Sequence, residues 1–192
     1  MPSLQQPGPA EEDPDVALMR EVASESPDAF AALIRRHQGA LLNFFLRMGA
    51  YSDGEDLVQE TFLRVYQYRK KYRPAARFKT FLYVVARHAW ADRCRALMRR
   101  ERLTASLRTD AEIRDDAPAR DRSAAVYDVQ TALDRLSPKL KEVLVLSVYQ
   151  GMRYQEIADI LGVPLGTVKS RVSLAVEAMR RFLDEPGKTS EP

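Results

Sequence analysis

The sequence predicts an all-α protein made of two small helical domains joined by a flexible linker. Almost every apolar stretch recurs with helical spacing, and no stretch shows the alternation typical of a strand. The periodicity disappears between residues 99 and 126, where charges of both signs mix with small residues, as is typical of linkers. The chain has 192 residues, of which 45% are apolar, enough for one medium core or two small ones. The predicted segments are a disordered acidic tail over 1–14, a first domain over 15–98, a linker over 99–126, a second domain over 127–183 and a polar tail over 184–192.

The composition excludes several classes of protein. No apolar run approaches the roughly 18 residues of a membrane span, which argues against membrane insertion. The first residues lack the basic start and apolar stretch of a secretory signal, and the single cysteine, Cys94, rules out an internal disulfide framework. Both features favour a cytoplasmic protein. His37 and His88 lie far apart and no glycine-rich phosphate loop is present, so no metal or cofactor is expected.

Charge is unevenly distributed along the chain. Residues 1–30 contain seven acidic side chains and one basic one, whereas residues 61–100 contain twelve Lys or Arg and one acid, Asp92, a local net charge of +11. Such a block indicates a polyanionic partner; the alternative is a solvated basic helix surface.

Four helices are expected in the first domain. One covers residues 15–24, a second begins at "SPDAF" with Ser26 as its cap, and a third begins at "SDGE", where Ser52 and Glu55 stand in capping-box spacing. Pro74 interrupts the chain before a fourth helix, which Thr80 is expected to cap. The inward positions expected on this fourth helix are Phe81, Val84, Val85, Ala89 and Cys94.

The third helix has two unlike sides. Apolar pairs recur every four residues on the side expected to face the core. Acids and amides, including Asp56, Gln59 and Glu60, occupy the side expected to face solvent or a partner.

The stretch "YQEIADILGVPLGTVKSRV" predicts a helix-turn-helix. Ile157, Ala158 and Leu161 form the inner face of a first helix, and Gly162 can adopt the left-handed conformation that ends it. The second helix has a buried stripe that includes Val168. Its opposite face is small and cationic, which suits insertion into the major groove of DNA, whereas an ordinary helical hairpin is the alternative. The candidate DNA-contacting residues are Thr167, Lys169, Ser170, Arg171 and Ser173.

Three segments, in this order and spacing, resemble the extracytoplasmic-function (ECF) sigma factors of bacterial RNA polymerase. "EDLVQETFLRVYQ" resembles the family's polymerase-binding helix, and "YRPAARFKTFLYVVARHAWADRCR" resembles its promoter-opening loop and following helix. "LDRLSPKLKEVLVLSVYQGMRYQEIADILGVPLGTVKSRV" resembles its carboxyl-terminal DNA-binding domain. The resemblance covers residues 15–98 and 127–183.

The resemblance implies a role for each surface. Asp56, Gln59 and Glu60 would dock on the coiled coil of the largest subunit of core RNA polymerase, and the second domain would meet the flap of the second-largest subunit. The second helix of the helix-turn-helix would read duplex DNA at the −35 element. An anti-sigma factor is implied as a further partner.

The resemblance also implies that the loop and the fourth helix bind the −10 element, partly as single-stranded DNA. Cations track a single strand and aromatic faces stack its bases, so Tyr72 and Phe78 are stacking candidates, although either ring can instead pack the loop down. Arg95 is expected to face duplex or backbone DNA. The remaining −10 candidates are Arg69, Lys70, Lys71, Arg73, Arg77, Lys79, Arg87, His88 and Arg93.

Two other functions compete with an initiation factor. A conventional helix-turn-helix regulator, binding duplex DNA without being a polymerase subunit, needs an upstream sensory domain, usually with strands, which residues 1–98 do not predict. An enzyme acting on nucleic acid needs catalytic carboxylates, a nucleophile or a metal set, and the sequence contains no such constellation.

Overall fold

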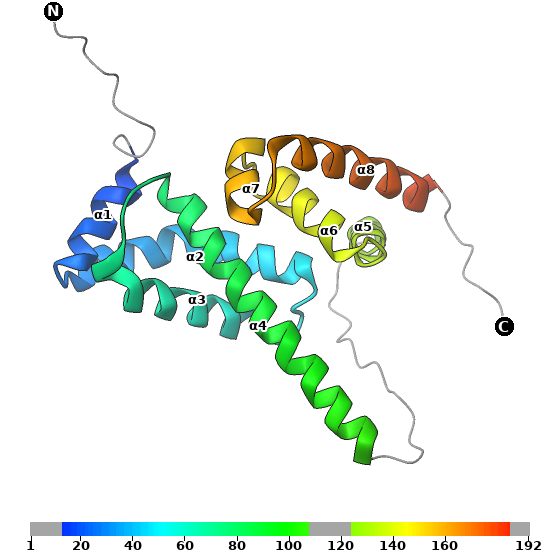
Figure 1. Cartoon of the computed structure of the whole chain (residues 1–192), viewed down its shortest axis with the longest axis horizontal. Coiled ribbons are helices and arrows are strands. Elements are labelled where there is room, and N and C mark those ends of the chain that lie inside the picture. Colours follow the sequence, from blue (N-terminus) through cyan, green and yellow to red (C-terminus); the bar gives the residue numbers. More distant parts are fainter. Residues whose placement is uncertain (1–12, 108–123, 185–192) are drawn as a thin grey trace, which may run out of the picture. The chain divides into compact units, whose positions relative to one another are not determined.

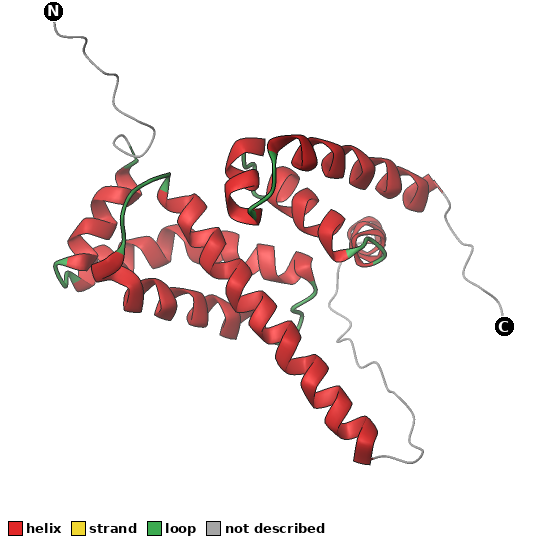
Figure 2. Cartoon of the chain, viewed as in Figure 1, coloured by secondary structure: helices red, strands yellow, loops and turns green. Residues whose placement is uncertain are grey.

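The computed structural model describes residues 13–107 and 124–184, and these residues form helices and loops without a strand (Figures 1 and 2). This confirms the all-α prediction. The elements are α1 (Pro14–Ala23), α2 (Pro27–Met48), α3 (Gly54–Tyr68), a 3-10 turn (Arg69–Lys71), α4 (Phe78–Leu107), α5 (Ala124–Asp134), α6 (Pro138–Leu144), a π-helical turn (Val145–Tyr149), α7 (Tyr154–Leu161) and α8 (Leu165–Asp184).

The chain divides into two compact units. The first comprises residues 1–42 and 53–115, and the second comprises residues 43–52 and 116–192. Residues 43–52, which the sequence placed in the first domain, therefore group with the carboxyl-terminal helices. Arg47, Met48 and Tyr51 form hydrogen bonds with side chains of α5 and α6, contacts that sequence periodicity cannot reveal.

The stretch expected as a linker is partly helical. α4 continues to Leu107 and α5 begins at Ala124, so both ends of 99–126 belong to helices. The run "RRER" after Met98 lacks an apolar period, but Arg and Glu are good helix formers and extending an existing helix costs little. The rest of the expected linker and most of both predicted tails lie outside the described residues.

The first unit buries one side of each of its four helices. Met19, Leu33, Phe62, Val65 and Leu82 are all at most 4% exposed. The predicted register of α4 is only partly right: Ala89 is buried, but Phe81, Val84, Val85 and Cys94 are half-buried. The fully buried positions are instead Phe78, Leu82, Tyr83 and Ala86, because packing along α3 decides which side is covered. α4 also begins at Phe78, three residues before the start expected from a cap at Thr80.

The amino-terminal caps of α2 and α4 come from different sources: a residue adjacent to the helix caps α2, and a residue far away in sequence caps α4. Ser26 caps α2 as predicted, since its hydroxyl accepts from the Ala29 N–H at 3.3 Å. The predicted capping box at α3 is wrong, because Asp53 is the N-cap residue and makes no side-chain cap. Thr80 lies buried inside α4, and the Phe78 N–H donates instead to the Asp13 carboxylate at 2.8 Å. A residue 65 positions away thus supplies the cap.

The second unit contains the predicted helix-turn-helix. Ile157, Ala158 and Leu161 are buried on α7, and Gly162 ends that helix with φ 64°. Val168 lies in the buried stripe of α8. A further apolar cluster joins α5, α6 and α8 through Leu133, Leu136, Leu144 and Ala175. The slim α8 is thereby braced from one side and free on the other.

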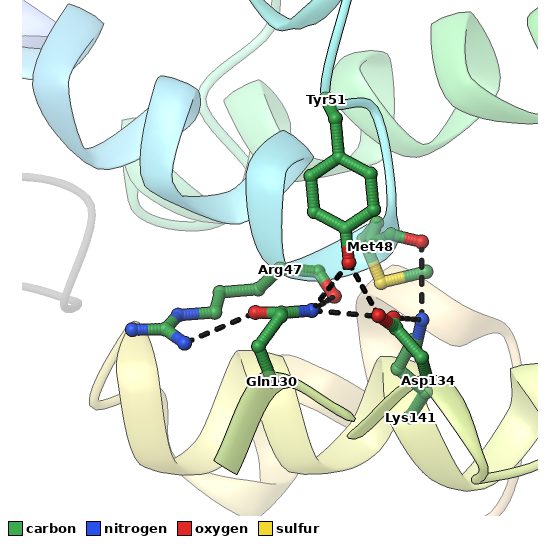
Figure 3. A network of polar contacts seen from close by, with 6 residues as sticks. All are labelled: Arg47, Met48, Tyr51, Gln130, Asp134 and Lys141. Carbon is green, nitrogen blue, oxygen red and sulfur yellow. Dashed lines mark hydrogen bonds and ion pairs between the residues drawn. The ribbon is translucent and has the colours of Figure 1, made fainter. Parts of the chain in front are cut away.

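A polar network completes the second unit (Figure 3). Lys141, 8% exposed, donates to the Asp134 carboxylate at 2.7 Å and to the Met48 carbonyl at 3.4 Å. Gln130, 5% exposed, accepts from the Arg47 guanidinium at 3.0 Å. The Gln130 amide also donates to the Tyr51 hydroxyl at 3.0 Å. These buried polar groups are paired, so they fix how residues 47–51 pack on α5 and α6.

Candidate functional site

The outer face of α3 presents the predicted docking residues together. Asp56 and Gln59 are exposed and Glu60 is half-buried. Glu60 accepts from the Arg64 guanidinium at 2.7 Å, and Arg64 also donates to Asp92 on α4 at 2.7 Å. The two carboxylates raise the pKa of Arg64, which therefore stays charged. Asp56 and Gln59 are thus available to a partner, while Glu60 is held by a neighbour.

Two depressions flank this face between α2 and α3. One, of about 410 Å³, is lined by Gln38, Gly39, Leu42, Glu55, Val58 and Gln59. The other, of about 330 Å³, is mostly apolar and includes Phe30, Ile34 and Tyr66. Leu63, 51% exposed, lines this second depression one helical turn beyond Gln59 and Glu60. The sequence analysis missed Leu63 because an isolated leucine on a polar face carries no motif.

The basic turn after α3 has one cation turned inward and one outward. The Arg69 side chain is 17% exposed; its guanidinium lies 4.0 Å from the centre of the Tyr66 ring and donates to the Tyr66 carbonyl at 3.0 Å. The Lys70 side chain is 66% exposed and lies 3.1 Å from a Glu25 carboxylate oxygen. Arg69 therefore supports the turn, and Lys70 presents its charge to solvent.

Tyr72 and Phe78 do not present their rings. Tyr72 is 7% exposed and Phe78 is fully buried, and the two rings pack edge to face at 6.4 Å. Burial raises the pKa of Tyr72 to about 12, so the phenol stays protonated. Both rings pack the loop down onto the core, the alternative that the sequence left open, so neither presents a face for base stacking here.

A different aromatic side chain is exposed beside the basic turn. Tyr68 is 48% exposed, and its ring lies 5.8 Å from that of Phe81. Tyr68 stands three residues after the buried Val65, on the side of α3 that spacing assigns to the core, so its exposure at the end of the helix could not be predicted from the sequence. Tyr68 is the exposed ring nearest in sequence to Lys70.

The other −10 candidates differ in exposure. Lys71, Arg73, Arg77 and His88 are exposed, whereas Lys79, Arg87 and Arg93 are half-buried. Arg93 is paired with Asp53, and the predicted duplex contact Arg95 is paired with Asp92. Two arginines of α4 thus already have carboxylate partners.

The outer face of α8 gathers the −35 candidates. Lys169, Ser170 and Ser173 are exposed, and Thr167 and Arg171 are half-buried at the same end of the helix. Leu174, 53% exposed, follows one turn after Ser170 and Arg171 and was not singled out from the sequence. In the described part of the chain, Lys169 and Arg171 have no carboxylate at ion-pair distance.

Metal and membrane chemistry find no support in the described residues. No group of three or more His, Cys, Asp or Glu there could hold a metal ion, and none of the described helices is long and apolar enough to cross a bilayer. Burial raises the pKa of the Cys94 thiol, which disfavours a reactive thiolate.

Family models match both halves of the chain. The model of Sigma-70 region 2 matches residues 33–100, and that of Sigma-70, region 4 matches residues 127–179. The chain is 31% identical to a probable RNA polymerase sigma-C factor of Mycobacterium bovis, over 85% of this chain and 88% of the relative. It is 30% identical to the ECF RNA polymerase sigma-E factor of Haemophilus influenzae, over 88% and 94% respectively. It is 34% identical to ECF RNA polymerase sigma factor SigE of Mycolicibacterium smegmatis, of which it spans 60%.

Solved structures share the fold. CnrH, solved with the cytosolic domain of CnrY, matches with a TM-score of 0.72 at 24% identity, covering 91% of this chain and all of the other. The sigma factor RpoE of Bartonella quintana, solved with the anti-sigma factor NepR, matches with a TM-score of 0.68 at 25% identity, covering 82% and 98%.

Proposed function

Because this chain belongs to the ECF RNA polymerase sigma factors, we propose that it docks on core polymerase through α3, captures the −10 strand beside the turn Arg69–Lys71, and reads the −35 duplex with α8. As a sigma factor it directs RNA polymerase to promoters. The observation that carries the proposal is that one chain combines the two sigma regions, each with a polar face left open on its core-packed helices.

Docking on polymerase is supported by the division of α3 into two sides. Leu57, Phe62 and Val65 saturate the core side, so Asp56 and Gln59 contribute nothing to the core. Acids and amides on a fixed helix make a surface for a basic or polar partner helix, and Leu63 adds an apolar contact at its end. We assign this face to the coiled coil of the largest polymerase subunit.

Capture of the −10 strand is supported by the exposed cations around the turn. Lys70, Lys71, Arg73 and Arg77 are exposed within eight residues, a density that suits a phosphate backbone. The exposed Tyr68, against Phe81, supplies the stacking face that Tyr72 and Phe78 do not. Promoter opening is then capture without catalysis: binding of an extruded base offsets an unstacking cost of a few kcal/mol.

Reading of the −35 element is supported by Lys169 and Arg171, which have no carboxylate partner among the residues that the structure describes. Arg171 and Lys169 can reach guanine edges or phosphates from a helix that is slim on its outer side. Leu174 lies one turn further on the same side, where an apolar side chain suits a thymine methyl group.

An anti-sigma factor is proposed as a further partner. RpoE of Bartonella quintana was solved with the anti-sigma factor NepR, and this chain shares its fold at 25% identity. Control by a separate protein also fits a chain whose matched regions are both sigma regions.

Reconstitution tests the proposed function. The purified chain with bacterial core polymerase is expected to give promoter-specific transcripts, whereas the chain alone binds duplex DNA weakly and in a salt-sensitive way. Tight, site-specific binding of duplex by the free chain, with no complex formed with core polymerase, would instead establish the conventional helix-turn-helix regulator.

A further inference from the structure

Glu25 occupies an unusual backbone position. It has φ 67°, the left-handed region, and among the described residues it is the non-glycine residue found there. It follows the end of α1, where the Ser26 N–H donates back to the Glu21 carbonyl at 3.1 Å and the Glu25 N–H donates to the Val22 carbonyl at 3.0 Å. This is the helix-ending position at which glycine is usual, because a Cβ is strained there.

The strained position brings the Glu25 carboxylate onto the basic turn. One carboxylate oxygen lies 3.1 Å from the Lys70 ammonium and 3.4 Å from an Arg69 guanidinium nitrogen. Lys70 and then Arg69 hold the pKa of Glu25 below its ordinary value, so the carboxylate is charged at neutral pH.

Stability does not account for this arrangement. The Glu25 and Lys70 side chains are 60% and 66% exposed, and ion pairs between exposed groups contribute little to folding. Arg69 is already fixed by the ring and carbonyl of Tyr66. A glycine at position 25 would relieve the backbone without loosening the turn. Such strained residues tend to occur at functional sites.

We propose that Glu25 is an internal competitor of nucleic acid, whose carboxylate takes the place of a DNA phosphate on Lys70. The inference rests on the proposed −10 function of the turn and deepens it. In the free chain the carboxylate lowers the affinity of the turn for any single strand. A strand that displaces the carboxylate replaces one anion by another, so its charge adds little binding free energy. A sequence-specific base contact must supply the rest.

The test is binding of a fluorescein-labelled, 20-nucleotide single strand of mixed sequence to the full chain, measured by anisotropy at several salt concentrations. Glu25→Gln and Glu25→Gly are both expected to bind about 2–5-fold more tightly than the wild type at low salt, as loss of an exposed ion pair implies. The slope of log affinity against log salt steepens by about 0.7, the value for one more phosphate contact on a single strand. The matched control, Glu21→Gln, removes an exposed charge from the last turns of α1 and is expected to change neither quantity.

The two variants separate charge from strain. Glu25→Gln keeps the strained side chain, whereas Glu25→Gly removes it, so the melting temperature of Glu25→Gly should equal or exceed that of the wild type. If only the glycine variant gains affinity, backbone release rather than charge is responsible and the inference is wrong. If neither variant gains affinity, the inference is also wrong.

Lys70→Gln distinguishes failure of the inference from failure of the proposed function. Made in the wild-type chain, it is expected to weaken binding of the single strand. Combined with Glu25→Gln, it is expected to abolish the gain in affinity that Glu25→Gln gives alone. If Lys70→Gln weakens binding while Glu25→Gln changes nothing, the turn binds DNA but Glu25 does not compete. If Lys70→Gln leaves affinity and salt slope unchanged in both backgrounds, the basic turn does not bind single strands, and the −10 assignment fails.

Discussion

Residues 61–100 and the start of α8 both present cations, but they differ in whether those cations have partners within the chain. In residues 61–100, at least five of the twelve Lys and Arg side chains have carboxylate partners within the chain: Arg64, Arg69, Lys70, Arg93 and Arg95. On α8, by contrast, Lys169 and Arg171 have no such partner among the described residues. The local charge of +11 therefore overstates the positive surface of the first unit, whereas Lys169 and Arg171 near the start of α8 are available.

The difference separates two ways of binding a polyanion. A free cation binds phosphate at once and with little discrimination. A cation with an internal partner must exchange that carboxylate for a phosphate, so the net gain in binding free energy is small. Other contacts then decide which strand binds. The first unit is thus suited to selective capture after docking, and α8 is suited to direct contact with duplex DNA.

The largest expected effect concerns binding to core polymerase through α3, where the exposed Asp56 carboxylate is proposed to contact the partner. Asp56→Lys should weaken binding to core polymerase by about 100-fold or more, because like charges at an interface cost several kcal/mol. Fluorescence anisotropy of the labelled chain against core polymerase measures the loss. Glu21→Lys, an equal charge change on α1, is expected to bind normally. Wild-type affinity for Asp56→Lys would remove the assignment of α3.

The available cations of α8 should give the next largest effect. Arg171→Ala is expected to cost about 1–3 kcal/mol at one −35 position, and Lys169→Ala should weaken binding to all sequences alike if it contacts phosphate. Measured affinities of holoenzyme for a set of single-base −35 variants distinguish the two. Uniform weakening by Arg171→Ala would mark that residue as a phosphate contact.

Pairing should matter for stability where the cation is buried. Lys141→Ala leaves the Met48 carbonyl and Asp134 without their donor and should destabilise the second unit by about 1–3 kcal/mol. Urea unfolding measures the change. Lys139→Ala, exposed on the same helix, should stay within about 0.5 kcal/mol of the wild type. Equal stability of the two variants would contradict a structural role for the network in Figure 3.

A smaller effect is expected from Leu174. Replacing one −35 thymine by uracil removes a methyl group and should cost the wild type about 0.8 kcal/mol at the position that Leu174 contacts. The same replacement should not change the affinity of the Leu174→Ala variant for that DNA. Loss of affinity in both proteins would show that the methyl group contacts another residue.

The smallest effect concerns the paired surface of the first unit. Hydrogen bonds from Arg64 and then Arg95 hold the pKa of Asp92 below its ordinary value. A lowered folded-state pKa contributes stability that is present above the unfolded pKa and is lost as pH falls through the folded pKa. NMR titration of Arg64→Gln should show the Asp92 pKa returning toward normal, with a shallower loss of stability in acid. An unchanged Asp92 pKa would contradict the pairing.

Much of the fold was predictable because it depends on local periodicity. The core sides of α3, α7 and α8, the cap at Ser26 and the left-handed Gly162 all follow from spacing and backbone preference. The start of α4 did not follow, because its cap comes from Asp13, far away in sequence. The exposure of Asp56, Gln59, Lys169 and Ser170 was expected from residue type, but the burial of Tyr72 and Phe78 and the exposure of Tyr68 were not. The docking and DNA-binding roles of these faces stay predictions.

The sequence by itself determined most of the helices and the inner faces of α3, α7 and α8, since each is set by neighbours within a few residues. It also carried the resemblance to the two regions of a sigma factor. Only the tertiary structure decided which cations are free, which aromatic rings are exposed and which acid caps α4. Those properties depend on groups such as Glu25, Asp53 and Asp92, which meet their partners only after the helices pack. Charge can be counted along a chain, but the availability of a charge is a property of its surroundings in space.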